Sequence, residues 1–202
     1  MTEINFLCVH KKFRTKRMAP ILIKEVTRRV NSRGVFQAIY TSGSLFPCPF
    51  AECRYWHRNI NVKKLIDCSF SYLPEGRSMG LHKKYLKIPK EPTLAGVRQM
   101  EKKDAKDVHN LLTEYMKKMD VSFIYNKAEV AHQLLPREGV MSSWVVEDSE
   151  GKVTDFISYY ALPSTILKSQ KEDDKINACF SFYNVATSCT FTELIHNATI
   201  LA

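Results

Sequence analysis

The apolar positions in the first part of this 202-residue chain predict alternating strands and one helix. A continuous apolar run from Phe6 to Val9 indicates a strand over residues 5–9, and further strands are expected at 35–41 and around 54–58. Spacings of three and four predict a helix over residues 21–30, with Pro20 in its first turn and a turn at Gly34 after it. A strand, a helix and a second strand in this order predict a βαβ connection.

The remainder of the chain predicts a second α/β unit. Residues 95–101 are expected to form a strand, and one continuous apolar face predicts a helix over 104–119. Further strands are expected at 69–73, 144–147, 156–162 and 178–185. Residues 148–151 are expected to join the strands 144–147 and 156–162 as a hairpin. A last helix is expected at 191–202. Loops rich in charge are expected at 74–84 and 168–175, and Pro89 and Pro92 mark the boundary between the two units.

Composition narrows the class of protein. An apolar content of 45% with 11% aromatic residues excludes a disordered chain. No apolar run is long enough to span a membrane, and the first residues lack the apolar core that is typical of a signal peptide. The six cysteines are irregularly spaced, so neither a zinc site nor a disulfide framework is indicated, and we expect no metal. This cysteine usage favours a reducing, cytoplasmic location.

Positive charge is concentrated near the N-terminus. Residues 1–35 contain nine Lys or Arg residues against Glu3 and Glu25, within a chain of net charge +9. Charge alone favours a solvated or nucleic-acid-facing patch. However, five of these cations, Lys11, Lys12, Arg14, Lys16 and Arg17, lie between a predicted strand and the start of a predicted helix, whose unpaired N–H groups attract anions. This order predicts a site for phosphate groups.

Residues 3–20 resemble the acyl-CoA-binding segment of the glycylpeptide N-tetradecanoyltransferase, or N-myristoyltransferase, family. Four later segments resemble this family in the same order: residues 40–43, 53–58, 162–165 and 181–185. The resemblance implies an α/β fold of the GNAT-like (acyl-CoA N-acyltransferase) type, with a mixed sheet and flanking helices. The Arg98-containing strand followed by Asp104 at a helix start also resembles the opening of a GNAT-type domain.

The resemblance also implies a domain organisation. Residues 1–92 correspond to the C-terminal part of the acyl-CoA-binding GNAT-like half with its connection. Residues 93–202 correspond to an incomplete peptide-binding half. We therefore expect an internal fragment or a relative truncated at both ends.

The activity implied is transfer of a myristoyl group from myristoyl-CoA to the amine of an N-terminal glycine. By similarity, the backbone N–H groups of Phe6 and Leu7 form the oxyanion hole, and Thr41 holds the glycine amine. The alternative is that residues 6–9 are only a core strand. Cys8 lies beside His10, but no third group that would orient a Cys–His pair is visible, so Cys8 is assigned to the ligand-lining backbone.

The resemblance assigns the remaining binding residues. The acyl-CoA site would comprise Phe6, Leu7, Cys8, Val9, Arg14, Thr15, Lys16, Arg17, Met18 and Ala19. The peptide groove would comprise Thr41, Gly43, Tyr55, His57, Phe70, Tyr160 and Ser164, each of which has a purely structural alternative as a strand or turn residue. The sequence departs from the family pattern at Phe13, Thr15, Ser42, Ser69, Tyr72 and Phe180.

The resemblance implies that the proton acceptor is a terminal carboxylate. This carboxylate would follow a C-terminal segment of roughly fifty further residues.

Three hypotheses follow. The chain is part of an active enzyme, a non-catalytic relative that binds acyl-CoA or peptide, or a basic protein that binds polyanions. We expect myristoyl-CoA as acyl-donor substrate without a prosthetic group, and partners that are N-terminal-glycine peptides and nascent proteins. We expect a monomer with no nucleic-acid partner and no transmembrane segment, while peripheral contact with membranes is compatible with the basic surface.

Overall fold

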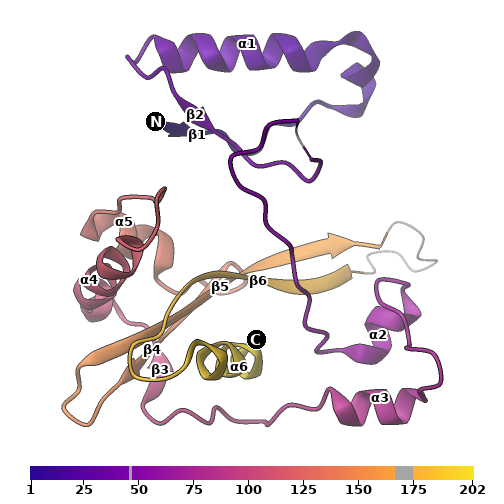
Figure 1. Ribbon diagram of the computed structural model, residues 1–202, viewed down its shortest axis with the longest axis vertical. Coiled ribbons are helices and arrows are strands. Elements are labelled where there is room, and N and C mark those ends of the chain that lie inside the picture. The colour runs from indigo at the N-terminus through magenta and orange to yellow at the C-terminus, as the bar shows by residue number, and fades with distance from the viewer. Residues whose placement is uncertain (46, 167–174) are drawn as a thin grey trace. The chain divides into compact units, whose positions relative to one another are not determined.

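The structure is a computed structural model that describes residues 1–45, 47–166 and 175–202. The chain divides into two compact units, Met1–Trp56 and His57–Ala202, and each is described by itself (Figure 1). The predicted domain division between residues 92 and 93 stays a prediction. Most of the expected charged loop at 168–175 lies outside the described residues.

The first unit is a small βαβ arrangement. Its elements are β1 (Thr2–Glu3), the 3-10 helix η1 (Lys11–Lys16), α1 (Met18–Asn31) and β2 (Ala38–Ile39). The strands β1 and β2 pair in parallel, so the predicted βαβ connection is confirmed. The helix begins three residues earlier than predicted, and Pro20 lies in its first turn, where its missing N–H leaves no helical hydrogen bond unmade.

The predicted strand over residues 5–9 is wrong. The last ladder bond of β1 runs from Ile4 N to Ile39 O at 2.9 Å, and beyond it the chain departs from extended geometry. Phe6 adopts a positive φ of 56° and is 97% exposed. An apolar run forms a strand only where a neighbouring strand satisfies its backbone groups. Since β2 ends at Ile39, residues 5–9 lack that neighbour among the described residues.

The second unit begins with two short helices, α2 (Val62–Asp67) and α3 (Met79–Tyr85), where a strand and loops were expected. The predicted strand at 69–73 is wrong, because the N–H groups of Phe70 and Ser71 both donate to Leu65 O at 3.0 Å and close the end of α2. Ser69 takes a positive φ of 59° there. The predicted strand at 54–58 is also wrong, since these residues have no regular secondary structure.

A four-stranded antiparallel sheet forms the centre of the second unit. Its strands are β3 (Val97–Gln99), β4 (Met141–Glu147), β5 (Val153–Thr165) and β6 (Lys175–Val185), in the order β3-β4-β5-β6. The predicted strands at 95–101 and 178–185 and the hairpin around 148–151 are confirmed, although β4 and β5 are longer than expected. Both helices expected here are confirmed as α4 (Ala105–Met116), preceded by η2 (Lys102–Asp104), and α6 (Phe191–Leu201).

Helices cover both faces of this sheet (Figure 1). On one face, α4 and the unpredicted α5 (Lys127–Leu134) pack Val108, Leu112 and Leu134 against Phe156. On the other face, Leu194 of α6 packs against a second cluster that includes Ile157 and Tyr159. The helix α5 carries a sequence signal that was missed, a capping box in which Asn126 and Glu129 each accept the other's backbone N–H.

Within the described ranges, no helix combines the length and the apolar character needed to cross a membrane.

Candidate functional site

The segment between β1 and η1 exposes backbone donors. Residues 5–8 are exposed and lack regular secondary structure. Among the described residues, neither the Phe6 nor the Leu7 backbone N–H donates a hydrogen bond. The positive φ of Phe6 turns this stretch out of strand geometry. Successive free N–H groups beside a left-handed residue are the arrangement that forms concave anion sites.

The cationic loop is ordered by its own side chains. His10 caps η1, because its Nδ1 accepts a hydrogen bond from Lys12 N at 3.3 Å. Arg14 Nε donates to Val9 O at 3.2 Å, and the Lys16 ammonium lies 5.5 Å from the Phe13 ring centroid. His10 therefore has a structural role in the loop, and Phe13 holds one of its cations.

The start of α1 completes the features expected of an anion site. Arg17 is left-handed, with φ 53° and ψ 36°, and its side chain makes no capping hydrogen bond. Every residue from Lys11 to Pro20 is exposed. Because α1 has fourteen residues, its dipole adds positive potential at this end, next to the side chains of Lys16 and Arg17. The loop predicted to hold phosphates is thus electropositive in both backbone and side chains.

Three of the residues predicted for peptide binding lie after β2 in the first unit. Thr41, Gly43 and Tyr55 are exposed and lie outside regular secondary structure. The space around Gly43 is open, so a side chain there would meet no described atom within 4 Å. This openness is compatible with the close approach of another backbone.

The other four predicted peptide residues lie in the second unit. His57 and Phe70 are in edge-to-face ring contact, with centroids 5.3 Å apart. Tyr160 and Ser164 occupy the same face of β5, since they are four residues apart on one strand. The structure therefore brings His57 and Phe70 into contact and places Tyr160 and Ser164 on one face of β5.

Tyr160 belongs to an aromatic cluster on the β5–β6 ribbon. Its ring stacks on Phe180, the cross-strand partner, with centroids 5.0 Å apart. Phe182 makes an edge-to-face contact with Tyr160 at 5.6 Å. Phe180, a departure from the family pattern, thus supports the ring of a predicted peptide-binding residue by stacking.

A charge network fixes the beginning of the second sheet. The Arg98 guanidinium donates to both carboxylate oxygens of Asp104 at 2.7 Å and also bonds Glu147. Hydrogen bonds from Arg98 lower the pKa values of Asp104 and Glu147. The Arg and Asp that suggested a GNAT-type start are therefore direct partners, and their role here is to join β3, η2 and β4.

A buried carboxylate was not found by sequence reasoning. Asp155 on β5 is 0% exposed and accepts hydrogen bonds from the backbone N–H groups of Thr187 at 2.7 Å and Ser188 at 2.9 Å. Burial alone would raise its pKa, but hydrogen bonds from Ser188, Thr154 and these backbone groups lower it below the ordinary value. Burial, together with the Asp155 charge, raises the pKa of the neighbouring Cys189 thiol to about 11. Asp155 thus anchors the turn that leads into α6.

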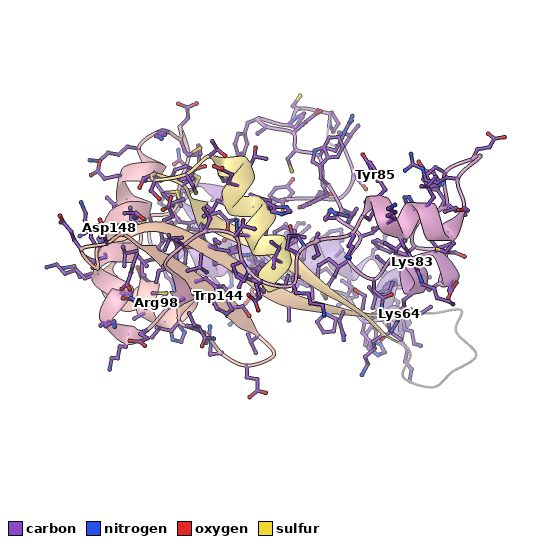
Figure 2. The ribbon with its side chains drawn as sticks, turned by 90° about the horizontal axis from the view of Figure 1, so that it is seen from below. Lys64, Lys83, Tyr85, Arg98, Trp144 and Asp148 are labelled. Carbon is purple, nitrogen blue, oxygen red and sulfur yellow. The ribbon has the colours of Figure 1, made fainter. Side chains whose placement is uncertain are left out.

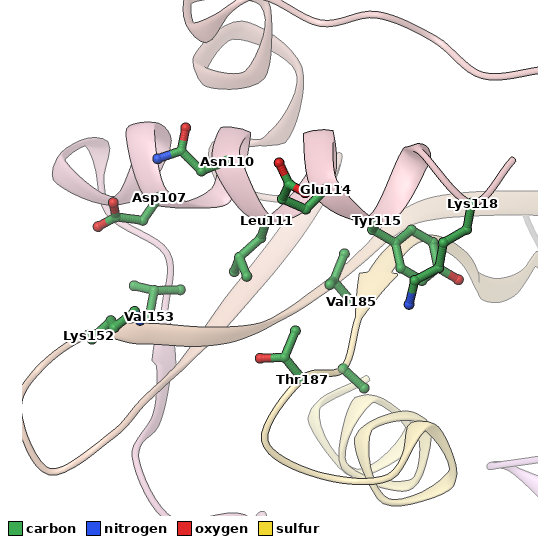
Figure 3. Close-up of a pocket in the computed structure, with 11 residues that line it drawn as sticks. Asp107, Asn110, Leu111, Glu114, Tyr115, Lys118, Lys152, Val153, Val185 and Thr187 are labelled. Carbon is green, nitrogen blue, oxygen red and sulfur yellow. The ribbon is translucent and has the colours of Figure 1, made fainter.

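A groove of about 410 Å³ lies between α4 and the ends of β5 and β6 (Figure 3). Leu111, Tyr115, Val153 and Val185 line its apolar floor. Charges of both signs surround this floor. The sequence-predicted site residues do not line it, so this groove is separate from the candidate site.

Comparison with known families matches almost the whole chain. The family model described as the N-terminal domain of myristoyl-CoA:protein N-myristoyltransferase matches residues 1–53, and the model of the C-terminal domain matches residues 67–202. The predicted acyl-CoA residues all lie in the first region, and the predicted peptide residues lie in one or the other region except Tyr55 and His57, which fall between them.

Individual relatives agree with the family models. The glycylpeptide N-tetradecanoyltransferase of Drosophila melanogaster is 45% identical over 100% of this chain and 43% of its own length. The Arabidopsis thaliana enzyme 1 of the same name is 47% identical over 100% of the chain and 46% of its own length. The chain thus spans less than half the length of these curated relatives.

Solved structures share the fold. A crystal structure of Saccharomyces cerevisiae N-myristoyltransferase with bound myristoyl-CoA superposes with a TM-score of 0.91 and 36% identity. The match covers 98% of this chain and 50% of the yeast chain. The predicted α/β, GNAT-like fold class is therefore confirmed.

Proposed function

This chain belongs to the myristoyl-CoA:protein N-myristoyltransferase family, and from that premise we propose that it carries the phosphate-binding loop and part of the peptide groove of an enzyme that transfers myristate from myristoyl-CoA to N-terminal glycines. The match of both family models in order along the chain is the observation that carries the proposal. The yeast relative with bound myristoyl-CoA supports the choice of acyl donor.

The electropositive loop supports binding of the CoA phosphates. Exposed Lys16 and Arg17 flank the open N-terminus of α1, where backbone N–H groups and the helix dipole favour anions. Charge-assisted hydrogen bonds to phosphate are the stronger class of such bonds. We propose that this loop holds the phosphates and so fixes the position of the thioester relative to residues 6–9.

The free N–H groups of Phe6 and Leu7 support the proposed oxyanion hole. When the glycine amine attacks the thioester carbonyl, the oxygen gains charge, and two backbone donors would stabilise it. The C–S bond then breaks, CoA leaves as the thiolate, and the proton lost by the attacking amine passes through solvent to that thiolate. Thr41, exposed after β2, is proposed to hold the incoming amine by its hydroxyl. The peptide that carries this amine would contact Gly43, Tyr55, His57, Phe70, Tyr160 and Ser164.

Calorimetric titration with a non-hydrolysable myristoyl-CoA analogue tests this proposal. Lys16→Ala combined with Arg17→Gly removes two charges at the helix start, and glycine accepts the left-handed conformation of residue 17. We expect at least tenfold weaker binding, because each lost phosphate contact costs about 1.5 kcal/mol or more.

The matched control, Lys24→Ala with Arg33→Ala, removes the same charge from elsewhere on α1 and the turn that follows it and should leave affinity within about twofold. Equal losses in both variants, or equal affinity of the native chain for the analogue and for duplex DNA, would contradict a specific acyl-CoA site. The cytoplasmic location and the monomeric state remain predictions.

A further inference from the structure

Two threonines of the first unit lie between cations at the spacing that basophilic protein kinases select. Such kinases have acidic substrate grooves and recognise a Ser or Thr with Lys or Arg three residues before it and two residues after it. Two hydroxyls in the 202-residue sequence meet both conditions: Thr15, between Lys12 and Arg17, and Thr27, between Lys24 and Arg29. Because the two threonines share this pattern, a preference between them must come from the structure.

Thr27 is held inside a helix. It lies within α1, and its Oγ1 donates a hydrogen bond to Ile23 O at 2.9 Å. Transfer of a phosphoryl group to this oxygen would require that hydrogen bond to break and the surrounding helix to unwind. Thr27 therefore serves as a matched control within the same chain, with the same flanking charges but a bonded hydroxyl.

Thr15 lies in a weaker element. It is exposed, η1 has no buried residue, and in the part of the chain that the structure describes the Thr15 hydroxyl forms no hydrogen bond. A 3-10 helix of six residues is longer than this helix type usually sustains. The side-chain hydrogen bonds from Lys12 N to His10 and from Arg14 to Val9 O are both exposed to solvent. Local opening of η1 therefore costs little free energy and presents Thr15 to a kinase.

A second cation-rich stretch lacks this combination. It forms α2 and α3, where Lys64 and Lys83 lie (Figure 2). Ser78, at the start of α3, has Glu75 three residues before it, and its Oγ accepts a hydrogen bond from Leu81 N at 3.3 Å. An acidic residue at that position repels an acidic kinase groove. Among the described residues, flanking cations and a hydroxyl without a hydrogen bond therefore coincide at Thr15.

We propose that Thr15 is a phosphorylation site for a basophilic protein kinase and that the phosphate on Thr15 closes the cationic loop to acyl-CoA. In the modification, Thr15 Oγ1 attacks the γ-phosphorus of ATP and forms a new O–P bond. The bond between that phosphorus and the oxygen that bridges it to the β-phosphate breaks, and ADP leaves. The hydroxyl proton passes to the carboxylate base of the kinase.

The phosphate on Thr15 would meet the cations of its own loop. It carries a charge of about −1.5 to −2 at pH 7 and three strong acceptor oxygens. Lys16 and Arg17 follow it directly in the sequence, and α1 begins at Met18. Because the phosphate is covalently attached, it competes for these donors at a high effective concentration. The closure of the loop rests on the proposed function, since it requires the same donors to hold the phosphates of CoA.

Incubation of the whole chain with ATP and the catalytic domain of protein kinase C, followed by mass spectrometry, tests the modification site. Cleavage after glutamate separates the two threonines, since Glu25 lies between them, and Thr15 is the one hydroxyl in residues 4–25. We expect Thr15 to be phosphorylated at least about tenfold faster than Thr27, because η1 opens more easily than the interior of α1. Equal rates at the two threonines, or no phosphate on Thr15, would overturn the site.

Paired charge variants test recognition by the flanking cations. Lys12→Ala with Arg17→Gly should slow phosphorylation of Thr15 at least about tenfold. Lys24→Ala with Arg29→Ala removes the same charge around Thr27 and should leave the rate at Thr15 within about twofold. Equal slowing by both variants would show that net charge alone attracts the kinase and would overturn the proposal.

Calorimetric titration of the phosphorylated chain with the non-hydrolysable myristoyl-CoA analogue tests the closure of the loop. We expect binding at least about tenfold weaker than that of the unmodified chain, restored when a phosphatase removes the phosphate. Equal affinity before and after phosphorylation would overturn the closure. An unmodified chain that does not bind the analogue would overturn the proposed function and the closure with it, whereas mass spectrometry decides the modification site by itself.

Discussion

The two units carry similar apolar content but differ in what they bury. Among the described residues of Met1–Trp56 none is buried, and Ile21, Ile23 and Phe36 are at least half exposed. In His57–Ala202, two apolar clusters lie on opposite faces of one sheet. The apolar periodicity of α1 and α4 is alike in the sequence. Only the second unit turns that periodicity into a packed core.

The comparison shows what holds each unit together. The first depends on a short parallel ladder, the hydrogen bonds of α1 and the capping of η1 by His10. Isolated helices of this length are marginal in water. The second unit gains most of its stability from apolar burial. We therefore expect substitutions of comparable chemistry to have unequal effects in the two units.

The largest expected difference comes from removing a phenyl ring in each unit. Phe156→Ala removes a fully buried ring from the core and should lower the free energy of unfolding by about 3–5 kcal/mol. Phe36→Ala removes a ring that is 78% exposed and should change it by no more than about 0.5 kcal/mol. Urea unfolding monitored by tryptophan fluorescence measures both. Equal effects would remove the distinction between the units.

A buried carboxylate gives the next largest effect. Because the folded-state pKa of Asp155 is depressed, its stabilisation is present above its ordinary pKa of about 4 and is lost as pH falls through the folded value. Asp155→Asn should destabilise the chain by about 2 kcal/mol at pH 7 and flatten the dependence of stability on pH below about 4. Unfolding curves at a series of pH values test this. A slope identical to that of the native chain would show that Asp155 does not contribute.

A smaller effect is expected at the contact between α6 and residues 93–94. Asn197 Oδ1 accepts the backbone N–H groups of Thr93 at 2.7 Å and Leu94 at 3.2 Å. Asn197→Ala leaves these donors without that acceptor and should cost about 1–2 kcal/mol. The exposed Asn177 on β6 provides the control, since Asn177→Ala should be nearly neutral. Equal denaturation midpoints for the two variants would contradict this role.

The smallest effect is expected for a surface ion pair in the first unit. Hydrogen bonds from Arg28 and Arg29 lower the pKa of Glu25 to about 2, and the three side chains lie at the surface in contact with solvent. Solvent and salt screen such pairs, so Glu25→Gln should leave the denaturation midpoint nearly unchanged. A slight loss of helicity at low salt, absent at high salt, is the expected signature in circular dichroism. A loss that persists at high salt would mean that packing of Glu25 matters more than its charge.

The sequence predicted an element correctly where its local apolar pattern matches the residues that the core buries. The apolar face of α4, the turn at residues 148–151 and the apolar spacing of α6 are local signals, and each predicted its element correctly. It failed at residues 5–9, 54–58 and 69–73, because a strand-like local pattern forms a strand only if a partner strand is available. That partner is a property of the whole chain.

The candidate site divides in the same way. The sequence by itself determined the family, the βαβ order and the cationic loop before a helix, because these depend on residues close together in the chain. Only the tertiary structure placed Asp155 under the Thr187–Ser188 turn and stacked Tyr160 on Phe180. These contacts join residues that are distant in sequence, and no local pattern encodes them.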